Sequence, residues 1–161
     1  MPTVTITGAD ASIAIGTTAA ASNVQQFEDD TYDVIEQTSE IGEFGDERNI
    51  VSFITLADGR TLKARGSADA GDMDITYAHK PGGDDGQDAL LSAFNASQGA
   101  DEFNFRVMLD DQITPSTGNP TTYYFRGKVV SNRLQAISPD GTVTRLARVA
   151  INTAILTVDA V

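Results

Sequence analysis

The sequence predicts a mainly β protein of one domain, built from antiparallel strands with a single short α-helix. Runs of alternating apolar and polar residues recur between Gly- and Asp-containing turns, as in half-buried strands. Only one stretch, about residues 85–96, combines helical capping with an apolar face. Aromatic residues make up 7% of the 161 residues and Trp is absent, so small and β-branched side chains must fill one compact core.

The N-terminal segment, residues 1–30, is rich in Ala, Thr, Ser and Gly. Its small side chains and weak periodicity indicate an N-terminal arm or a loosely ordered edge, with a short strand around Ser12–Ile15. The next run, Thr31–Gln37, alternates as a strand does. Residues 1–50 hold ten acidic residues against Arg48 alone, which indicates an interaction surface or, equally, a solvated acidic face.

The segment Thr38–Asn49 is acidic, contains glycines and is too long for a tight turn, so we expect a long loop. It carries two isolated apolar residues, Ile41 and Phe44. Apolar side chains on a protruding loop can dock into a neighbouring molecule, and we expect these two to do so.

A β-hairpin is expected next. Ile50–Leu56 is rich in β-branched residues, and the following Ala57–Arg60 forms a turn of the Asp-Gly type. Thr61–Arg65 returns as a strand, and Met73–Ala78 is a further strand with apolar residues at period two. Alternation along the returning strand places Leu62 and Ala64 on one face, and Lys63 and Arg65 on the other.

The helix is the next element. Asp84 or Asp85 can cap its N-terminus, and Gln87 stands three residues after Asp84 as in a capping box. A helix of about three turns is too short to be stable alone, so we expect it to pack on the sheet. Its apolar face consists of Leu90, Leu91 and Phe94.

Three strand regions complete the fold: Phe103–Leu109, Thr121–Asn132 and Thr142–Val158. A loop, Asp110–Pro120, separates the first two. The last region is long and apolar, and we expect it to bend or break near Asn152.

Groups that carry catalysis are scarce. His79 is the only histidine and stands beside Lys80 at a strand end, where a loop role is expected. The sequence contains no Cys and neither a G-x-S-x-G nor an S-x-x-K motif. The Gly82–Gly86 loop is acidic and lacks the Gly-Lys-Ser/Thr of a phosphate-binding loop. We therefore expect no enzymatic activity and no cofactor.

Five aspartates, namely Asp72, Asp74, Asp84, Asp85 and Asp88, are close enough in sequence to suggest calcium. Their spacing does not match an EF-hand loop, and turns and helix capping explain them, so we expect no metal. A calcium-stabilised β-sandwich that serves as a binding or adhesion module remains the alternative from a different class.

The composition also bears on partners. Met1–Gly8 lacks the basic and apolar regions of a signal peptide, and no apolar run approaches the roughly 20 residues of a membrane span, so we expect cytoplasmic synthesis and no membrane partner. The net charge of −12 disfavours wrapping around DNA, which needs clustered Lys and Arg. It is compatible with DNA as a passenger, since a surface that repels phosphate suits a smooth conduit.

Three motifs in this order resemble the tail tube (major tail) proteins of long-tailed, non-contractile bacteriophages. They are the turn A-G-D-M-D-I at Ala70–Ile75, the helix D-G-Q-D-A-L-L at Asp85–Leu91 and the strand F-R-G-K-V at Phe125–Val129. The resemblance covers about residues 30–158, including strands at Phe103–Val107 and Val149–Asn152.

The resemblance implies a β-sandwich or partly closed barrel with one flanking helix, and a structural role in the tail of a virion. Subunits of that family form rings, usually of six, that stack into a tube. One sheet of each subunit lines a β-barrel lumen through which phage DNA passes as a non-specific passenger. The implied partners are other copies of the chain and other tail proteins, namely the tape measure, terminator and distal tail proteins. Synthesis would take place in the cytoplasm of a bacterial host.

In that family a long loop between the early strands reaches the adjacent ring, and by position this stacking loop is residues 38–49 here. A tail terminator and the tube protein of a secretion or gene-transfer machine are alternatives within the same class. The residues expected at the inter-ring or inter-subunit contact are Glu40, Ile41, Glu43, Phe44, Asp46, Glu47 and Arg48.

Overall fold

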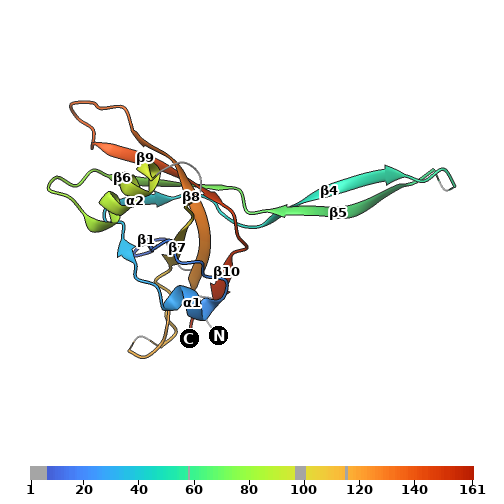
Figure 1. The fold of residues 1–161 in the computed structure, drawn as a ribbon, viewed down its shortest axis with the longest axis horizontal. Coiled ribbons are helices and arrows are strands. Elements are labelled where there is room, and N and C mark those ends of the chain that lie inside the picture. The colour runs from blue at the N-terminus through green and yellow to red at the C-terminus, as the bar shows by residue number, and fades with distance from the viewer. Residues whose placement is uncertain (1–6, 58, 97–100, 115) are drawn as a thin grey trace.

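A computed structural model describes residues 7–57, 59–96, 101–114 and 116–161 of the protein (Figure 1). The fold is mainly β, as predicted, and every strand pairing among the described residues is antiparallel. Neither described helix is long and apolar enough to cross a bilayer. The elements are β1 (Ser12–Ile15), α1 (Val24–Glu28), β2 (Asp33–Val34), β3 (Thr38–Ile41), β4 (Glu47–Ile54), β5 (Thr61–Asp69), β6 (Asp72–Ala78), α2 (Asp85–Asn95), β7 (Phe103–Met108), β8 (Thr122–Leu134), β9 (Thr144–Ile151) and β10 (Leu156–Val158).

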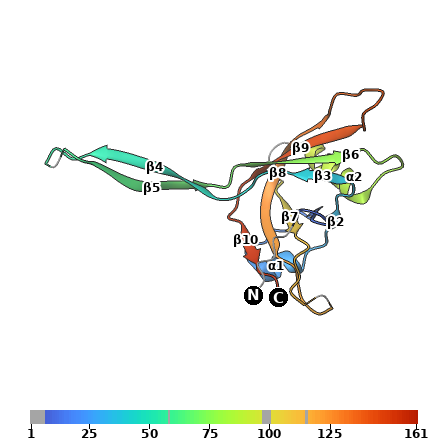
Figure 2. The same cartoon turned by 180° about the vertical axis from the view of Figure 1, so that it is seen from behind.

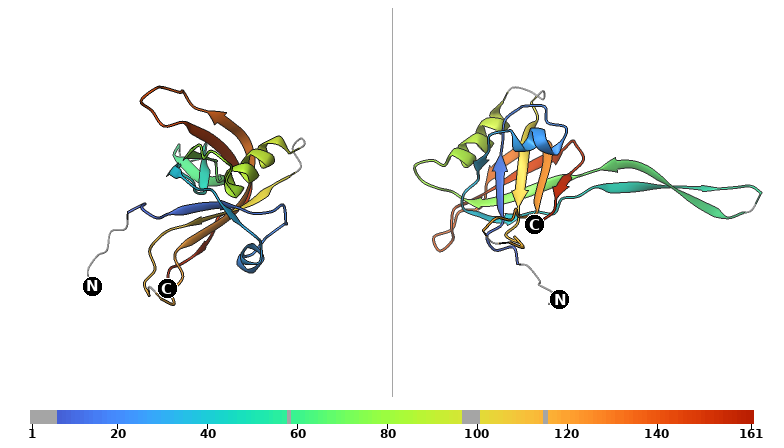
Figure 3. Two further views of the ribbon diagram at one scale, coloured as in Figure 1. Left: turned by 90° about the vertical axis from the view of Figure 1, so that its left-hand side faces the viewer. Right: turned by 90° about the horizontal axis from the view of Figure 1, so that it is seen from below.

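Eight strands form one sheet in the order β2-β1-β7-β8-β9-β6-β3, with β10 paired to β8. The first part of the long strand β8 pairs with β7 and the second part with β9. The sheet bends along β8, so that its two halves incline toward each other as the layers of a sandwich (Figure 3). The end strands β2 and β3 are not paired with each other, so this sheet does not close into a barrel within the described residues.

Gly127 marks the position on β8 where the strand changes partners. It is aligned with Phe103 of β7 and with Ile151 of β9. A Cβ atom at this position would lie 2.6 Å from the carbonyl oxygen of Ala150, which is closer than van der Waals contact allows. The glycine therefore lets two backbones approach where the sheet bends.

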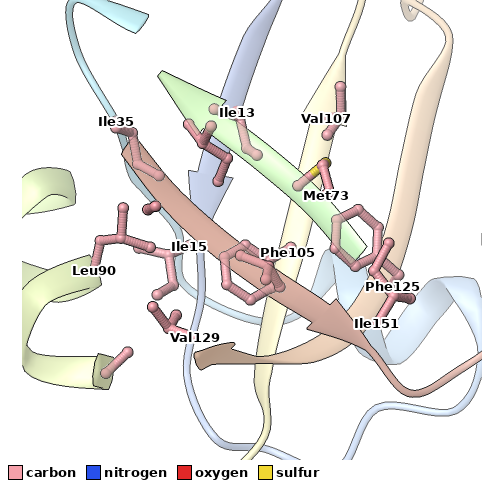
Figure 4. Packing of buried hydrophobic residues seen from close by; sticks show 14 of the residues in the cluster. Ile13, Ile15, Ile35, Met73, Leu90, Phe105, Val107, Phe125, Val129 and Ile151 are labelled. Atoms are coloured by element: carbon pink, nitrogen blue, oxygen red, sulfur yellow. The ribbon is translucent and has the colours of Figure 1, made fainter. Parts of the chain in front are cut away.

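The core lies between the two halves of the sheet, and α2 covers one of its open sides (Figure 4). The rings of Phe105 and Phe125 stack with centroids 5.6 Å apart in the middle of this core. Their neighbours come from both layers: Ile13, Ile15, Met73, Val107, Val129 and Ile151 from strands, Ile35 from the segment after β2 and Leu90 from α2.

The predicted helix is confirmed, and so is its cap. Asp84 accepts a hydrogen bond of 3.0 Å from the backbone amide of Gln87. Gln87 does not complete a capping box, because its side-chain amide donates to the carbonyls of Glu36 and Ala78 at 3.0 Å each. These two hydrogen bonds link the first turn of α2 to the connection between β2 and β3 and to the last residue of β6. The predicted apolar face is only partly correct, since Leu91 and Phe94 are exposed while Leu90 is fully buried.

The short strand predicted around Ser12–Ile15 is confirmed as β1, but the prediction of a loose arm is wrong for the described part of residues 1–30. Strand β1 lies inside the sheet between β2 and β7, and Ile13 and Ile15 belong to the core. Helix α1, which was not predicted, places Phe27 against the outer face of the sheet, with its ring stacked 5.4 Å from that of Tyr124. Residues 1–6 of the expected arm lie outside the described residues.

A polar anchor holds this N-terminal segment in place. The side-chain amide of the fully buried Asn104 donates to the Asp30 carboxylate at 2.7 Å and to the Ala19 carbonyl at 2.9 Å. Arg126 donates from Nε to the Asn104 side-chain oxygen at 3.0 Å. Because a buried amide needs partners for both its oxygen and its nitrogen, this network stabilises one path of the chain across the sheet.

Two further predicted segments differ from the structure, and a third prediction is confirmed. The strand expected over Thr31–Gln37 is only two residues long. The long loop expected over Thr38–Asn49 is wrong at both ends, because strand β3 occupies its start and strand β4 begins at Glu47. The predicted break near Asn152 is confirmed, since it separates β9 from β10.

Candidate assembly surface

The β4–β5 hairpin is the part of the molecule that extends farthest from the sandwich (Figures 1 and 2). It forms its own two-stranded sheet, and every residue of β4 is exposed. In β5 all residues are exposed except Gly66, which is half-buried. An isolated two-stranded ribbon is marginally stable in water, and this hairpin leaves both faces uncovered.

The hairpin forms because its local sequence suits it. Gly59 has φ +57°, in the left-handed region that the predicted Asp-Gly turn requires, and its amide donates to the Thr55 carbonyl at 3.0 Å. The predicted strand pair is confirmed, and its last paired residues are Ile54 and Thr61. Asp58 of the predicted Asp-Gly turn lies outside the described residues. The register shifts between Arg48 and Ile50, where β5 has one residue more than β4, so the ribbon has a bulge near Gly66.

One face of the hairpin is apolar. Val51 pairs with Ala64 and Phe53 pairs with Leu62, and paired residues of an antiparallel ribbon share a face. Phe53 is 50% exposed, although a phenyl ring gains about 1.5–3 kcal/mol when it is fully buried. Such an exposed apolar strip on a soluble protein is typical of a surface that another molecule covers.

The opposite face of the hairpin carries positive charge. Lys63 pairs with Ser52 and Arg65 pairs with Ile50, and Arg48 follows the same even-numbered series along β4. None of these three cations forms an ion pair with another described residue. The predicted division of β5 into an apolar and a basic face is confirmed by this register.

An acidic groove of about 490 Å³ lies at the base of the hairpin. Phe44 and Ala70 line the groove together with exposed acidic residues. Asp69 accepts a hydrogen bond of 2.9 Å from the Gly71 amide, which shapes the turn between β5 and β6. None of the groove carboxylates forms an ion pair within the described part of the chain. They are Glu43, Asp46, Glu47, Asp69 and Asp72.

A second groove, of about 520 Å³, lies on the other side of Phe44 and is mainly apolar. Ile41, Val107 and Tyr123 line it together with Glu40 from β3. Because β3 is the last strand of the sheet, its outer edge also leaves backbone groups without a strand partner among the described residues.

The seven residues expected at an inter-subunit contact surround these two grooves and the start of β4, but two of them do not project as expected. Ile41 pairs with Ile75 in the sheet, and Phe44 lies 5.5 Å from the Tyr123 ring and 5.9 Å from the Phe125 ring. Both side chains pack against the core. The element that reaches outward is the hairpin rather than the 38–49 segment. That these seven residues take part in a contact between subunits stays a prediction.

The groups considered for catalysis and for calcium lie elsewhere. His79 is exposed at the end of β6, and its backbone amide donates to the Val143 carbonyl at 2.9 Å. Asp84 caps α2, while Asp74 accepts from Arg148 at 2.8 and 3.1 Å. The hydrogen bond from Arg148 is the main cause that lowers the pKa of Asp74. Within the described residues no three His, Asp or Glu side chains form a group that could hold a metal ion.

Comparison with known proteins rests on structure alone. No protein-family model matches the chain, and no curated protein sequence matches it. The sheath/tube terminator of an extracellular contractile injection system (PVC) has a TM-score of 0.72 at 10% identity, and covers 98% of this chain and 99% of its own. The tube-terminating cap of the anti-feeding prophage has a TM-score of 0.71 at 10% identity, with 97% and 92% covered. The SPP1 tail tube has a TM-score of 0.65 at 17% identity, with 95% and 78% covered.

These similar structures include contractile injection systems as well as the SPP1 tube, so they do not single out the non-contractile phages that the sequence resembles. At identities of 10–17% the likeness establishes the fold. The chain has a tail-tube-like β-sandwich fold, with the architecture that tail tube and tube-terminator proteins share.

Proposed function

We propose that the protein is a structural, non-enzymatic subunit of a tail-like tube, in which rings stack through the β4–β5 hairpin. The observation that carries the proposal is the hairpin itself. It exposes Ile50 and Ile54 at 68% and 69% on one face and the Val51–Phe53 strip on the other. A neighbouring subunit that covered these side chains would bury apolar surface worth about 25 cal/mol per Å².

The sandwich offers a second means of assembly, within a ring. Within the described residues the end strands β2 and β3 have unpaired edges, and ring closure is one way in which proteins remove such edges. The proposed ring contains six subunits, as in the phage tail tubes that the sequence resembles. The other proposed partners are the tape measure, terminator and distal tail proteins, and the proposed location is the tail of a virion.

DNA is the proposed passenger of the lumen during ejection. The net charge of −12 supports this role, because each phosphate bound by a lysine or arginine would hold the DNA and impede its movement. We therefore expect a neutral or negative lumen. A reconstruction of an assembled tube with a lumen dominated by Lys and Arg would contradict this part of the proposal.

Electron microscopy of the purified protein tests the proposed function. The wild-type protein should form hollow tubes with a regular axial repeat. A variant in which Asn-Gly replaces residues 50–65 removes the exposed ribbon and leaves the sandwich intact. It should remain folded by circular dichroism and stop at subunits or single rings. Tubes of normal length from this variant would show that the hairpin does not mediate stacking.

A tube terminator is the second candidate function. The two terminator structures match nearly the whole of both chains and have higher TM-scores than the SPP1 tube. A terminator would form a ring of one size with its hairpin intact, whereas a tube subunit would continue to polymerise as the protein concentration rises. A monomer whose stability falls when calcium is chelated would instead support the β-sandwich binding module.

A further inference from the structure

We propose that the cationic face of the hairpin docks into the acidic groove at the hairpin base of a second copy of this chain. The inference rests on the proposed tube function and identifies the two surfaces of the stacking contact. The occupant is a second copy because the chain itself supplies both a cationic ribbon and an acidic groove. Opposite charge across an interface favours encounter and fixes its register.

The donor surface is one face of the ribbon. Arg48, Lys63 and Arg65 lie on it beside Ile50 and Ile54, and all five residues are exposed. Charged and apolar side chains share this face, so one docked partner would gain ion pairs and bury apolar surface in the same step. This pattern is unlike the opposite face of the ribbon, where Val51, Phe53, Leu62 and Ala64 present apolar side chains only.

The acceptor surface is the acidic groove. Its five acidic residues come from the segment before β4, from the first residue of β4 and from the strand ends at the β5–β6 turn, and they line one hollow of about 490 Å³. Arg48 is the nearest cation of the hairpin in sequence, and a single arginine leaves the groove with an excess of negative charge. Like charges held together at a surface repel, and an incoming pair of cations would relieve that repulsion.

Two of the three hairpin cations, Lys63 and Arg65, lie too far along the ribbon to neutralise the groove of their own chain. Arg65 and Lys63 lie four and six residues before Asp69 on the same extended strand, which corresponds to about 13–20 Å. Exposed charges are largely screened beyond about 8–10 Å at physiological ionic strength. Lys63 and Arg65 are therefore available to the groove of a neighbouring copy.

The contact is heterologous, because its donor and acceptor surfaces occupy different places on the same chain. A docked pair still has a free cationic face on one copy and a free acidic groove on the other. A contact of this kind continues to add copies unless its geometry closes it into a ring. The hairpin therefore gives the assembly a direction, which a stack of identical rings requires.

Charge reversal in two complementary variants tests the inference. Lys63→Glu/Arg65→Glu makes the ribbon acidic, and Glu43→Lys/Asp46→Lys makes the groove basic. All four side chains are exposed and lie outside the sandwich core, so both variants should fold. Each variant alone brings like charges together, which should weaken self-association by at least about tenfold by sedimentation velocity.

Mixing the two variants should restore assembly, because the acidic ribbon of one then meets the basic groove of the other. The quadruple variant, which keeps the net charge of −12, should also assemble. Asp110→Lys/Asp140→Lys is the matched control, since it changes the net charge by as much as the groove variant at exposed sites away from the hairpin. Wild-type assembly should weaken as NaCl is raised from 50 to 500 mM.

Three results would overturn the inference: unchanged assembly of the two single-surface variants, no rescue on mixing, or a wild-type protein that is monomeric at every ionic strength. Salt-sensitive oligomers that are rescued on mixing but never form tubes would contradict the proposed tube while supporting the contact. Binding of duplex DNA by the wild type but not by Lys63→Glu/Arg65→Glu, with equal self-association, would assign the cationic face to DNA instead.

Discussion

The sandwich and the hairpin are built from the same types of strand-forming residue, but the sandwich buries these side chains and the hairpin exposes them. Phe105 in β7 is fully buried, whereas Phe53 in β4 is 50% exposed. Both residues stand in alternating strands, and both pair across an antiparallel ribbon. The difference lies in what covers them, because β7 is one strand of a folded sheet and β4 has a single partner. Local alternation therefore specifies a strand, while long-range packing decides whether the strand stabilises the subunit or remains available to another one.

Hydrogen exchange gives the largest expected contrast between the two regions. Amides of a central strand exchange only when much of the domain opens, while an exposed ribbon opens by itself. In subunits before assembly we expect amides of β4 and β5 to exchange roughly 10³-fold or more faster than those of β8. After assembly the hairpin amides should become protected. Equal protection in both regions of the free subunit would break the comparison.

Truncation of one phenylalanine in each region tests the same contrast in free energy. Phe105→Ala leaves a cavity beside Phe125 and should lower the free energy of unfolding by about 3–5 kcal/mol in urea titrations. Phe53→Ala removes an exposed ring and should change it by no more than about 0.5 kcal/mol. In tube formation by the folded proteins, Phe53→Ala should have the larger effect of the two substitutions, since it removes apolar contact area between subunits. A large loss of subunit stability from Phe53→Ala would contradict the comparison.

The sequence predicts the regular parts of the fold well, because their signals are local. The cap of α2 depends on Asp84 and Gln87, which are three residues apart, and the hairpin turn depends on the φ of Gly59. The strand break after Ile151 is similarly local. The place of β1 is different, since Ile13 and Ile15 are buried by β7 and by residues far along the chain. A four-residue strand among small residues carries too weak a pattern to predict its neighbours.

The assembly surface is predicted less well, for the same reason. The predicted strand Ile50–Leu56 has apolar residues on both faces, which is the usual pattern of a buried strand as well as of an uncovered ribbon. Nothing local distinguishes the two environments. Conversely, Phe44 stands among acidic residues, yet its ring packs on Tyr123 and Phe125. Only the three-dimensional fold separates an isolated apolar residue that docks outward from one that packs inward.

Glycines in the two regions sharpen the comparison with a smaller effect. Gly127→Ala places a methyl group 2.6 Å from the Ala150 carbonyl oxygen, where two strands of the sandwich would have to move apart. We expect a loss of about 1–3 kcal/mol in the free energy of unfolding. A methyl group at Gly66 would lie 3.1 Å from the Asn49 carbonyl oxygen, in a ribbon that is free to adjust. Thermal unfolding should therefore show a lower Tm for Gly127→Ala than for the wild type, and almost no change in Tm for Gly66→Ala.

Acid titration tests whether the half-exposed carboxylate of Asp30, at the rim of the sandwich, contributes to the free energy of unfolding. Solvated side chains such as those of the hairpin should contribute little. Burial by itself would raise the pKa of Asp30, but hydrogen bonds donated by Thr17 and Asn104, together with the Thr31 amide, hold it below its usual value of 3.8. A carboxyl whose pKa is lowered by folding stabilises the native state above its unfolded pKa of about 3.9, and this contribution disappears as the pH falls through the folded pKa. Asp30→Asn should therefore lower the free energy of unfolding by about 1 kcal/mol at pH 7 and by less at pH 3. Urea titrations at the two pH values measure the difference, and an equal loss at both would show that the charge of Asp30 does not help to hold the N-terminal segment on the sheet.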